Sequence, residues 1–193
     1  MDQLTMGIGL CAFVAFFLVL PKFKPSLVKV QQGKAIVISR AADIPGLGSK
    51  GVNVFFDNTY VIKAFDAWEY LDMTIKSIDV DCRGKDALLS RDKVPMDISA
   101  TFHLRILRDE EAVLLVAETM GCEGASDMTK LNKLFGARFR DALRITCEAM
   151  DSNQLLNERH IFRSELFEVI GMDLSGYHFE DADIKLLEKS SFG

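Results

Sequence analysis

The sequence has no excess of basic residues and no recognisable catalytic motif. Its 193 residues carry 23 lysines and arginines against 28 aspartates and glutamates, which gives a net charge of −5. This balance argues against nucleic-acid binding as the main role, because phosphate contacts need a basic surface. The sequence contains no phosphate-binding P-loop and no GxSxG nucleophile elbow. We therefore expect no enzyme activity, no cofactor and no metal site.

Cysteine and histidine are also scarce. The cysteines fit no zinc-ligand spacing: Cys11, Cys82, Cys122 and Cys147. Four cysteines can pair in a secreted protein. In a chain with a plausible core and no cleavable signal, free thiols in a reducing compartment are the favoured interpretation. The histidines have no ligand partner at helical spacing, and we interpret them as surface residues: His103, His160 and His178.

One long hydrophobic run begins the sequence. Residues 4–20 contain no charge, and a helix of this length extends about 26 Å, near the lower limit for crossing a bilayer. A buried core helix should show polar residues at helical spacing, and a signal peptide should show positive charge before the run. Neither pattern is present. We therefore predict a transmembrane anchor at residues 1–24, with these residues carrying it: Leu10, Phe13, Phe16, Phe17, Leu20, Lys22 and Lys24.

The charges that follow the run predict its orientation. Lys22, Lys24, Lys29 and Lys34 all come after it, and the first acidic residue on that side is Asp43. The positive-inside rule then places the C-terminal side in the cytoplasm. We expect a single-pass protein of the cell membrane with its soluble domain on the cytoplasmic side, which agrees with reduced cysteines.

Strand patterns fill the first half of the remaining chain, and helical patterns follow. In residues 94–107, apolar and polar side chains alternate, which is typical of a strand with one covered face. Further strands are expected at residues 28–30, 35–38, 52–56, 59–65, 71–81 and 174–184. In residues 71–81 the apolar phase changes between Ile75 and Ile78, which predicts a bulge or bend. Helices are expected at 109–120, 126–150 and 151–170; the last begins with capping-box spacing and ends at Gly171. This order predicts the α+β class, with an antiparallel-rich sheet and packed helices.

A glycine-rich loop precedes one apolar segment of particular interest. Residues 46–51 formally match GxGxxG, but the dinucleotide-binding version opens a helix and a strand-like segment follows here. We therefore interpret it as a hairpin loop. The apolar residues Val54, Phe55 and Phe56 come next. They form either a tip that dips into the inner leaflet or an ordinary part of the core.

Two charged clusters also have more than one interpretation. Arg138, Arg140 and Arg144 lie on the predicted long helix, and they serve either ion pairs or contacts with a neighbouring subunit, where arginine is favoured. The acidic cluster at residues 180–183 has the ligand type that hard cations prefer. It lacks the periodic ligands and the glycine of a calcium loop, so a solvated strand end is the favoured interpretation.

Several segments, in order, resemble the SPFH/band 7 family, in particular flotillin-like bacterial inner-membrane proteins. Residues 28–38 (VKVQQGKAIVI) are similar to the family's opening strand pair. Residues 88–98 (LLSRDKVPMDI) resemble a strand that the family opens with Leu-Thr-Lys-Asp. Residues 139–144 (FRDALR) resemble its helix containing Ala-Leu-Arg, and residues 157–171 resemble the helix before its last strand.

This resemblance implies a domain at residues 28–186 and a tail at 187–193. It implies a membrane-anchored, homo-oligomeric scaffold that organises membrane microdomains or membrane protein complexes. The implied partners are membrane lipids, further copies of the chain and another integral membrane protein. The alternative is a regulatory partner of a membrane-bound protease or transporter. Flotillin-like proteins continue into a long coiled coil, whereas this sequence ends at Gly193, so we expect a truncated sequence or a short variant.

Overall fold

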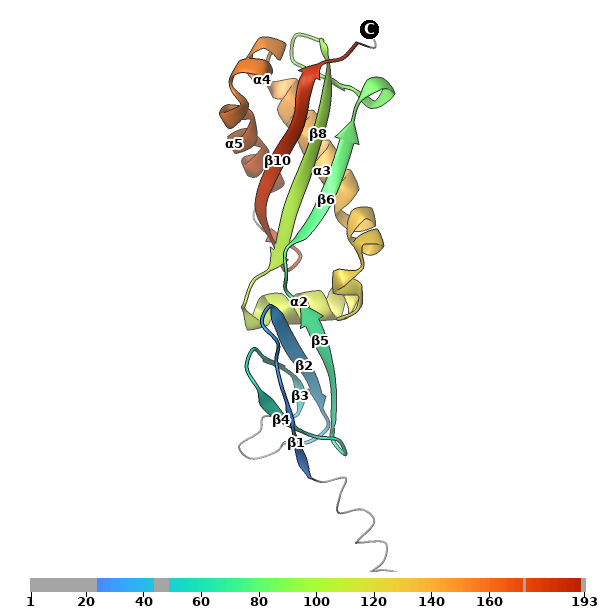
Figure 1. Cartoon of the computed structure of the whole chain (residues 1–193), viewed down its shortest axis with the longest axis vertical. Coiled ribbons are helices and arrows are strands. Elements are labelled where there is room, and N and C mark those ends of the chain that lie inside the picture. The colour runs from blue at the N-terminus through green and yellow to red at the C-terminus, as the bar shows by residue number, and fades with distance from the viewer. Residues whose placement is uncertain (1–23, 44–48, 172, 192–193) are drawn as a thin grey trace, which may run out of the picture. The chain divides into compact units, whose positions relative to one another are not determined.

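A computed structural model of the chain describes residues 24–43, 49–171 and 173–191 (Figure 1). The chain divides into two compact units, unit 1 (Met1–Tyr70) and unit 2 (Leu71–Gly193). Within the described residues, no helix is both long and apolar enough to cross a bilayer. Of the predicted anchor residues, Lys24 is described and exposed. The others lie outside the described residues: Leu10, Phe13, Phe16, Phe17, Leu20 and Lys22.

Unit 1 consists of short strands in two small sheets. The strands are β1 (Pro25–Val28), β2 (Lys34–Arg40), β3 (Gly51–Phe55), β4 (Thr59–Ile62) and β5 (Asp66–Asp72). β1 pairs antiparallel with β4, and the other sheet has the order β3–β2–β5. β2 and β3 are antiparallel, with Arg40 opposite Gly51. The predicted hairpin between these two strands is therefore confirmed.

The core of unit 1 forms from alternate residues of these strands. Ile36 and Ile38 of β2 are fully buried and pack with Val28 and Val61. Alternation with period two explains this, because successive side chains of a strand point to opposite faces. Three partly buried hydrophobic residues complete the cluster: Val30, Phe55 and Trp68.

At residues 71–81, where the sequence predicted one strand with a bulge or bend, the chain forms parts of two strands separated by a turn. β5 ends at Asp72, and β6 begins at Lys76. The Asp72 carboxylate accepts hydrogen bonds from the Thr74 backbone N–H at 2.9 Å and from Lys76 Nζ at 2.7 Å. An aspartate that binds the backbone two residues ahead favours a turn over an extended strand.

Unit 2 contains the larger sheet, with the order β6–β8–β10–β9 and β7 paired to β8. Its strands are β6 (Lys76–Cys82), β7 (Leu88–Leu89), β8 (Pro95–Ile106), β9 (Asp173–Leu174) and β10 (Tyr177–Lys189). β8 confirms the strand predicted at residues 94–107. β10 runs past residue 186, the predicted domain end, because Leu187 is buried and pairs with Ile98.

Helices lie against one face of this sheet and at its end (Figure 1). At the end lies α2 (Glu110–Met120), and against the face lie α3 (Met128–Ala149), α4 (Ser152–Asn157) and α5 (Arg159–Ile170). The unit also has 3₁₀ turns η2 (Gly84–Asp86) and η3 (Gly124–Ser126). The single helix predicted at 151–170 is therefore wrong. It breaks at Glu158, just after Asn157 turns its side-chain amide back to the Asn153 carbonyl at 2.9 Å. Such local bonds compete with the helix. The predicted capping box at Asp151 and the stop at Gly171 are both present.

Aromatic rings fill the space between sheet and helices. Phe102 of β8 stacks on Phe139 of α3 with ring centroids 4.3 Å apart. Phe179 of β10 packs against both rings and against Phe167 of α5. Such pairs contribute about 0.5–1.5 kcal/mol each beyond their burial. The rings therefore join the central strand to two helices.

The turn between β9 and β10 packs tightly on α2. Ser175 and Gly176 both have positive φ, at 57° and 88°, the backbone of a tight two-residue hairpin. A Cβ on Gly176 would lie 2.8 Å from the Ala112 carbonyl oxygen and 2.8 Å from Val116 Cγ2. Only glycine fits this contact.

Candidate functional site

The uncovered face of the unit 2 sheet carries an ordered polar network. His103, at the centre of β8, contacts Ser77 Oγ through Nδ1 at 3.0 Å and Asp183 Oδ2 through Nε2 at 3.1 Å. These residues come from β6, β8 and β10, so one row of side chains crosses three strands. His103 is thus half-exposed on this face and bonded to both neighbouring strands.

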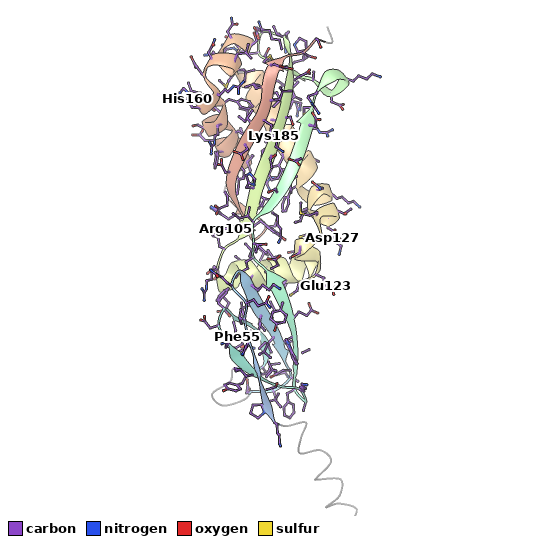
Figure 2. All side chains as sticks on the ribbon, viewed as in Figure 1. Phe55, Arg105, Glu123, Asp127, His160 and Lys185 are labelled. Carbon is purple, nitrogen blue, oxygen red and sulfur yellow. The ribbon has the colours of Figure 1, made fainter. Side chains whose placement is uncertain are left out.

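A second row runs beside the first. Asp79 of β6 accepts hydrogen bonds from Thr101 Oγ1 and from Lys185 Nζ, the latter at 2.8 Å. These bonds lower the pKa of the Asp79 carboxyl. Arg105 pairs with Glu180 on the same face. Figure 2 shows Lys185 and Arg105 on this side of the sheet. Cross-strand pairs of this type contribute roughly 0.2–1 kcal/mol each.

The Ser77–His103–Asp183 row joins three strands of the sheet. Its two hydrogen bonds link β6 to β8 and β8 to β10, and β8 is paired on both sides with the same two strands. The row therefore forms a set of cross-strand hydrogen bonds.

A groove lies between α5 and the outer edge of β10. Its volume is about 740 Å³, and its lining includes Arg159, His160, Arg163, Phe167, Asp183 and Ile184. Arg163 pairs with Asp181, and Arg159 Nη2 donates to the Leu187 carbonyl at 3.4 Å. The groove therefore has cations on its helical wall and strand backbone along its other side. Figure 2 shows His160 on that helix.

A similar groove lies at the opposite edge of the same sheet, between β6 and α3. Its volume is about 610 Å³, and its lining includes Asp79, Val80, Lys133, Gly136, Ala137 and Arg140. A Cβ on Gly136 would meet no atom within 4 Å. The middle of this groove is thus open, with a cationic side chain on either side along α3.

The three arginines predicted as oligomer contacts have different surroundings. Arg138 Nη2 donates to the Ile170 carbonyl at 3.0 Å, which caps the end of α5. Arg144 pairs with Asp141 and Glu148 on its own helix, at 3.5 and 3.4 Å. Arg140 lines the β6–α3 groove. The structure therefore leaves Arg140 best placed to meet another molecule.

The acidic cluster at residues 180–183 is dispersed by the fold. Glu180 pairs with Arg105, Asp181 with Arg163, and Asp183 with His103. Across residues 24–43, 49–171 and 173–191, no three His, Cys, Asp or Glu side chains gather as a metal site.

Cys82, Cys122 and Cys147 are all buried. Burial raises the pKa of the Cys147 thiol to about 12 and also raises that of Cys82. A thiol held in its neutral form is a poor nucleophile. Cys82 and Cys147 therefore serve packing.

Asp92 forms a contact that sequence patterns did not reveal. Its carboxylate accepts hydrogen bonds from Ser90 Oγ, from the Ser152 backbone N–H at 3.0 Å and from Ser152 Oγ at 2.7 Å. These bonds hold the pKa of Asp92 well below its ordinary value. Ser152 is sixty positions away in sequence. The sequence offered one signal for a contact at this residue, its position at the start of a predicted helix. The contact fastens the β7–β8 turn to α4.

Unit 1 exposes lysines beside aromatic rings. A shallow groove of about 720 Å³ is lined by Leu27, Lys29, Val30, Lys63, Trp68 and Tyr70, among others. Leu27 and Tyr70 are 47% and 44% exposed. The Tyr70 hydroxyl donates to the Lys29 carbonyl at 3.3 Å. Rings with a polar tip and lysines with long apolar stems suit a membrane–water interface.

The apolar segment predicted to dip into the leaflet is half-buried. Val54, Phe55 and Phe56 each have intermediate exposure, and Phe55 packs against the core of unit 1 (Figure 2). Val52, earlier in β3, is 48% exposed. The core contact gives Phe55 a structural role, and leaflet insertion of this segment stays a prediction.

The two units differ in charge. Residues 24–70 contain six lysines and arginines against four aspartates and glutamates, a net charge of +2. Residues 71–193 contain sixteen against twenty-three, a net charge of −7. Within unit 1, Arg40 and Asp66 neutralise each other in a buried ion pair. The basic excess of unit 1 is therefore carried by lysines.

Comparison with known proteins identifies the family of this chain. The chain is 24% identical over 186 residues to the flotillin family inner membrane protein YqiK of Escherichia coli (strain K12). The alignment covers 96% of this chain and 33% of YqiK, so the chain spans about a third of that relative's length. The model of the SPFH domain / Band 7 family matches residues 28–189, from β1 to the end of β10. The chain therefore belongs to the SPFH domain / Band 7 family.

Proposed function

We propose that the chain is a membrane-anchored scaffold that associates with further copies of itself and organises membrane patches or membrane protein complexes. The observation that carries this proposal is the lysine- and aromatic-rich surface of unit 1, which begins a few residues after the apolar run at 4–20. Family membership and the inner-membrane relative support the same conclusion.

The charge difference between the units supports contact with anionic lipid. A basic segment next to a membrane is attracted to anionic headgroups by about 1 kcal/mol per lysine or arginine, within a Debye length of the surface. An acidic segment is repelled by the same surface. Unit 1, with its net charge of +2, is the part of the chain suited to that contact. The predicted orientation, with the domain on the cytoplasmic side, follows the same rule.

Crosslinking the full chain in native membranes tests the scaffold. The chain has many exposed lysines, among them Lys29, Lys63 and Lys133, so an amine-reactive reagent will join neighbouring copies. We expect a series of adducts at multiples of the chain mass. A chain that remains a monomer under these conditions contradicts the proposal. One dominant adduct with a single other membrane protein supports the alternative role, a regulator of a membrane-bound protease or transporter.

A further inference from the structure

A small groove in unit 2 lies between α2 and the β9–β10 turn, at the end of the larger sheet (Figure 1). Its volume is about 290 Å³. Apolar side chains and acidic side chains line it together. The lining includes Leu107, Asp109, Glu111, Leu115, Gly176 and Tyr177. We call this feature the α2 groove.

The floor of the α2 groove is preformed. Tyr177 is buried, and its hydroxyl donates to the Ala125 carbonyl oxygen at 2.8 Å. Gly176 packs so closely on α2 that a Cβ would lie 2.8 Å from the Ala112 carbonyl oxygen. A ligand therefore meets a surface that needs little rearrangement, which lowers the cost of binding.

Two leucines leave apolar surface uncovered in this groove. Leu107 is 37% exposed and Leu115 is 43% exposed. Exposed apolar side chains that are scattered singly need no explanation, but these two line one hollow. Its volume of about 290 Å³ lies just below the range of small-molecule and cofactor pockets, which begins at about 300 Å³. The groove therefore suits an apolar side chain of a peptide better than a cofactor.

The surface around the groove is acidic. Residues 107–123 contain one arginine against one aspartate and four glutamates, a net charge of −4. Glu111, Leu115 and Glu118 are three or four residues apart, so they share one face of α2. Glu111 and Glu118 are exposed and form no ion pair within the part of the chain that the structure describes. Figure 2 shows Glu123 just beyond the same helix.

Helix stability explains only part of this charge. Glu110 and Glu111 lie in the first turn of α2 and favour the helix, because its N-terminus carries a partial positive charge. Glu118 lies in the last turn, where the helix carries a partial negative charge, and no basic residue accompanies it there. An acidic side chain at this position disfavours the helix. A cationic ligand would compensate for that cost.

We propose that the α2 groove binds a basic and partly apolar peptide segment of an integral membrane protein. Cytoplasmic segments next to membrane spans are rich in lysine and arginine. An apolar side chain of such a segment fills the groove beside Leu107 and Leu115, and its neighbouring cations meet Glu111 and Glu118. This inference rests on the proposed function, because it needs a domain on the cytoplasmic side of a membrane that the partner shares.

The charge of unit 2 favours a peptide over the membrane surface itself. Residues 71–193 carry a net charge of −7, and an anionic lipid surface repels such a segment. A basic peptide is attracted to it, and opposite charges speed the encounter and set the register. The apolar floor then favours those basic segments that carry an apolar side chain among their cations.

Binding of a synthetic peptide to the full chain in phosphatidylcholine nanodiscs tests the groove. The probe is a short fluorescein-labelled peptide of alternating lysine and leucine, followed by fluorescence anisotropy, with empty nanodiscs as the background. Glu111→Lys combined with Glu118→Lys should weaken binding about tenfold or more, and Leu115→Ser should weaken it severalfold. Glu165→Lys combined with Glu168→Lys, both exposed on α5, makes the same charge change and should have little effect.

The melting temperature separates loss of the site from loss of the fold. The three substituted side chains of α2 are exposed, and Glu118→Lys removes an acid from the negative end of the helix. The melting temperature of the Glu111→Lys, Glu118→Lys variant should therefore be unchanged or higher while its binding is weaker. Glu118→Gln removes the charge and keeps the size of the side chain, and it should weaken binding by a smaller factor.

Two controls would overturn the inference in solution. A peptide in which serine replaces every leucine has the same charge, and equally tight binding of that peptide would show charge attraction without use of the groove. Equal weakening by the α5 charge reversal would show that net charge, and not this surface, is responsible.

A crosslink in native membranes identifies the occupant. A photoreactive benzoylphenylalanine in place of Leu115 should join a lysine- or arginine-rich segment beside a membrane span of another protein. A crosslink to a second copy of the chain would overturn the inference.

Failure of the groove and failure of the proposed function are distinguishable. Absence of peptide binding, while the amine-reactive reagent still gives self-adducts in membranes, would remove the groove as a docking site and leave the scaffold intact. Loss of both the peptide binding and the self-adducts would count against the proposed function itself.

Discussion

Arg40 and Asp66 form a two-pronged ion pair that is completely buried in unit 1. Arg40 Nε donates to Asp66 Oδ1 at 2.7 Å, and Nη2 donates to Oδ2 at 3.1 Å. Both side chains are 0% exposed. Asp66 Oδ2 also accepts the Ile62 backbone N–H at 2.7 Å. The pair therefore joins β2 to the end of β4 and the start of β5, which come later in the chain.

Removing one member of this pair should unfold unit 1 before unit 2. Arg40→Met leaves a buried carboxylate without its partner, which costs about 3–5 kcal/mol. Lys34→Met, in the same strand but half-exposed, is the control and should change the free energy of unfolding by less than about 1 kcal/mol. Chemical denaturation followed by Trp68 fluorescence measures this, because Trp68 is the only tryptophan and lies in unit 1. Equal stability of the two variants would contradict the prediction.

The same pair should make unit 1 sensitive to acid. Burial opposes ionisation of Asp66, but the hydrogen bonds from Arg40 and Ile62 outweigh it, so its pKa is lowered. A carboxyl whose pKa is lower in the folded state contributes stability above its unfolded pKa of about 3.9, and that stability is lost as pH falls through the folded value. Trp68 fluorescence during acid titration should show unfolding below about pH 4. In Asp66→Asn the stability should be lower and should depend less on pH, and an unchanged pH dependence would refute this assignment.

Asp92 should control the order of the β7–β8 turn. Asp92→Ala removes the acceptor for both Ser90 and Ser152, so the turn at residues 90–94 loses its attachment to α4. We expect a lower melting temperature and faster proteolytic cleavage after Arg91 or Lys93. Asp86→Ala, at an exposed position in the neighbouring 3₁₀ turn, should leave the cleavage rate unchanged. Similar cleavage of the two variants would show that the Asp92 contact is dispensable.

The lysines of unit 1 should draw it onto anionic lipid. In proteoliposomes of the full chain, Trp68 emission should shift to shorter wavelength with phosphatidylglycerol, compared with phosphatidylcholine alone, because its groove is bordered by Lys29 and Lys63. Reversal of both charges, Lys29→Glu with Lys63→Glu, should weaken the contact about tenfold or more, at about 1 kcal/mol per charge. Lys130→Glu with Lys133→Glu in unit 2 makes the same charge change and should have little effect. If both pairs behave alike, net charge rather than this surface is responsible.

Phe55 should affect stability more than membrane contact. Its ring packs against the core of unit 1 while remaining half-exposed, so Phe55→Ser should cost about 1–2 kcal/mol from lost apolar burial. Val52→Ser, on the same strand and 48% exposed, should cost less. Denaturation curves of the two variants measure this. Loss of lipid contact without loss of stability in Phe55→Ser would instead support the leaflet-dipping interpretation.

Sequence patterns predicted well those helices and strands that their own periodicity defines. The alternation along β8 and the helical stripe of α3 depend on the chain's own period, so their bounds were nearly right. The break between β5 and β6 depends on one side chain, Asp72, turning back to Thr74 and Lys76. The change of apolar phase between Ile75 and Ile78 predicted a bulge or bend here, but not a turn between two strands, because both flanks have strand character.

Long-range contacts set the roles of the candidate residues, and the sequence does not show them. Arg138, Arg140 and Arg144 are indistinguishable as a helical cluster. Their roles diverge because Ile170 ends a different helix beside Arg138 and β6 lies beside Arg140. The same holds for Glu180, Asp181 and Asp183, whose partners come from β8 and α5. Contacts between segments that are distant in sequence decide these roles. The periodicity of apolar residues along the chain carries no information about such contacts.

The contact between Gly176 and α2 has a mechanical consequence. Since the turn leaves no room for even one methyl group against Ala112 and Val116, α2 and the β9–β10 hairpin must move as one piece. A displacement of α2 would therefore be transmitted directly to β10. β10 also lies beside only the short β9 at its outer edge, so strain on this helix would be transmitted directly to one edge of the sheet.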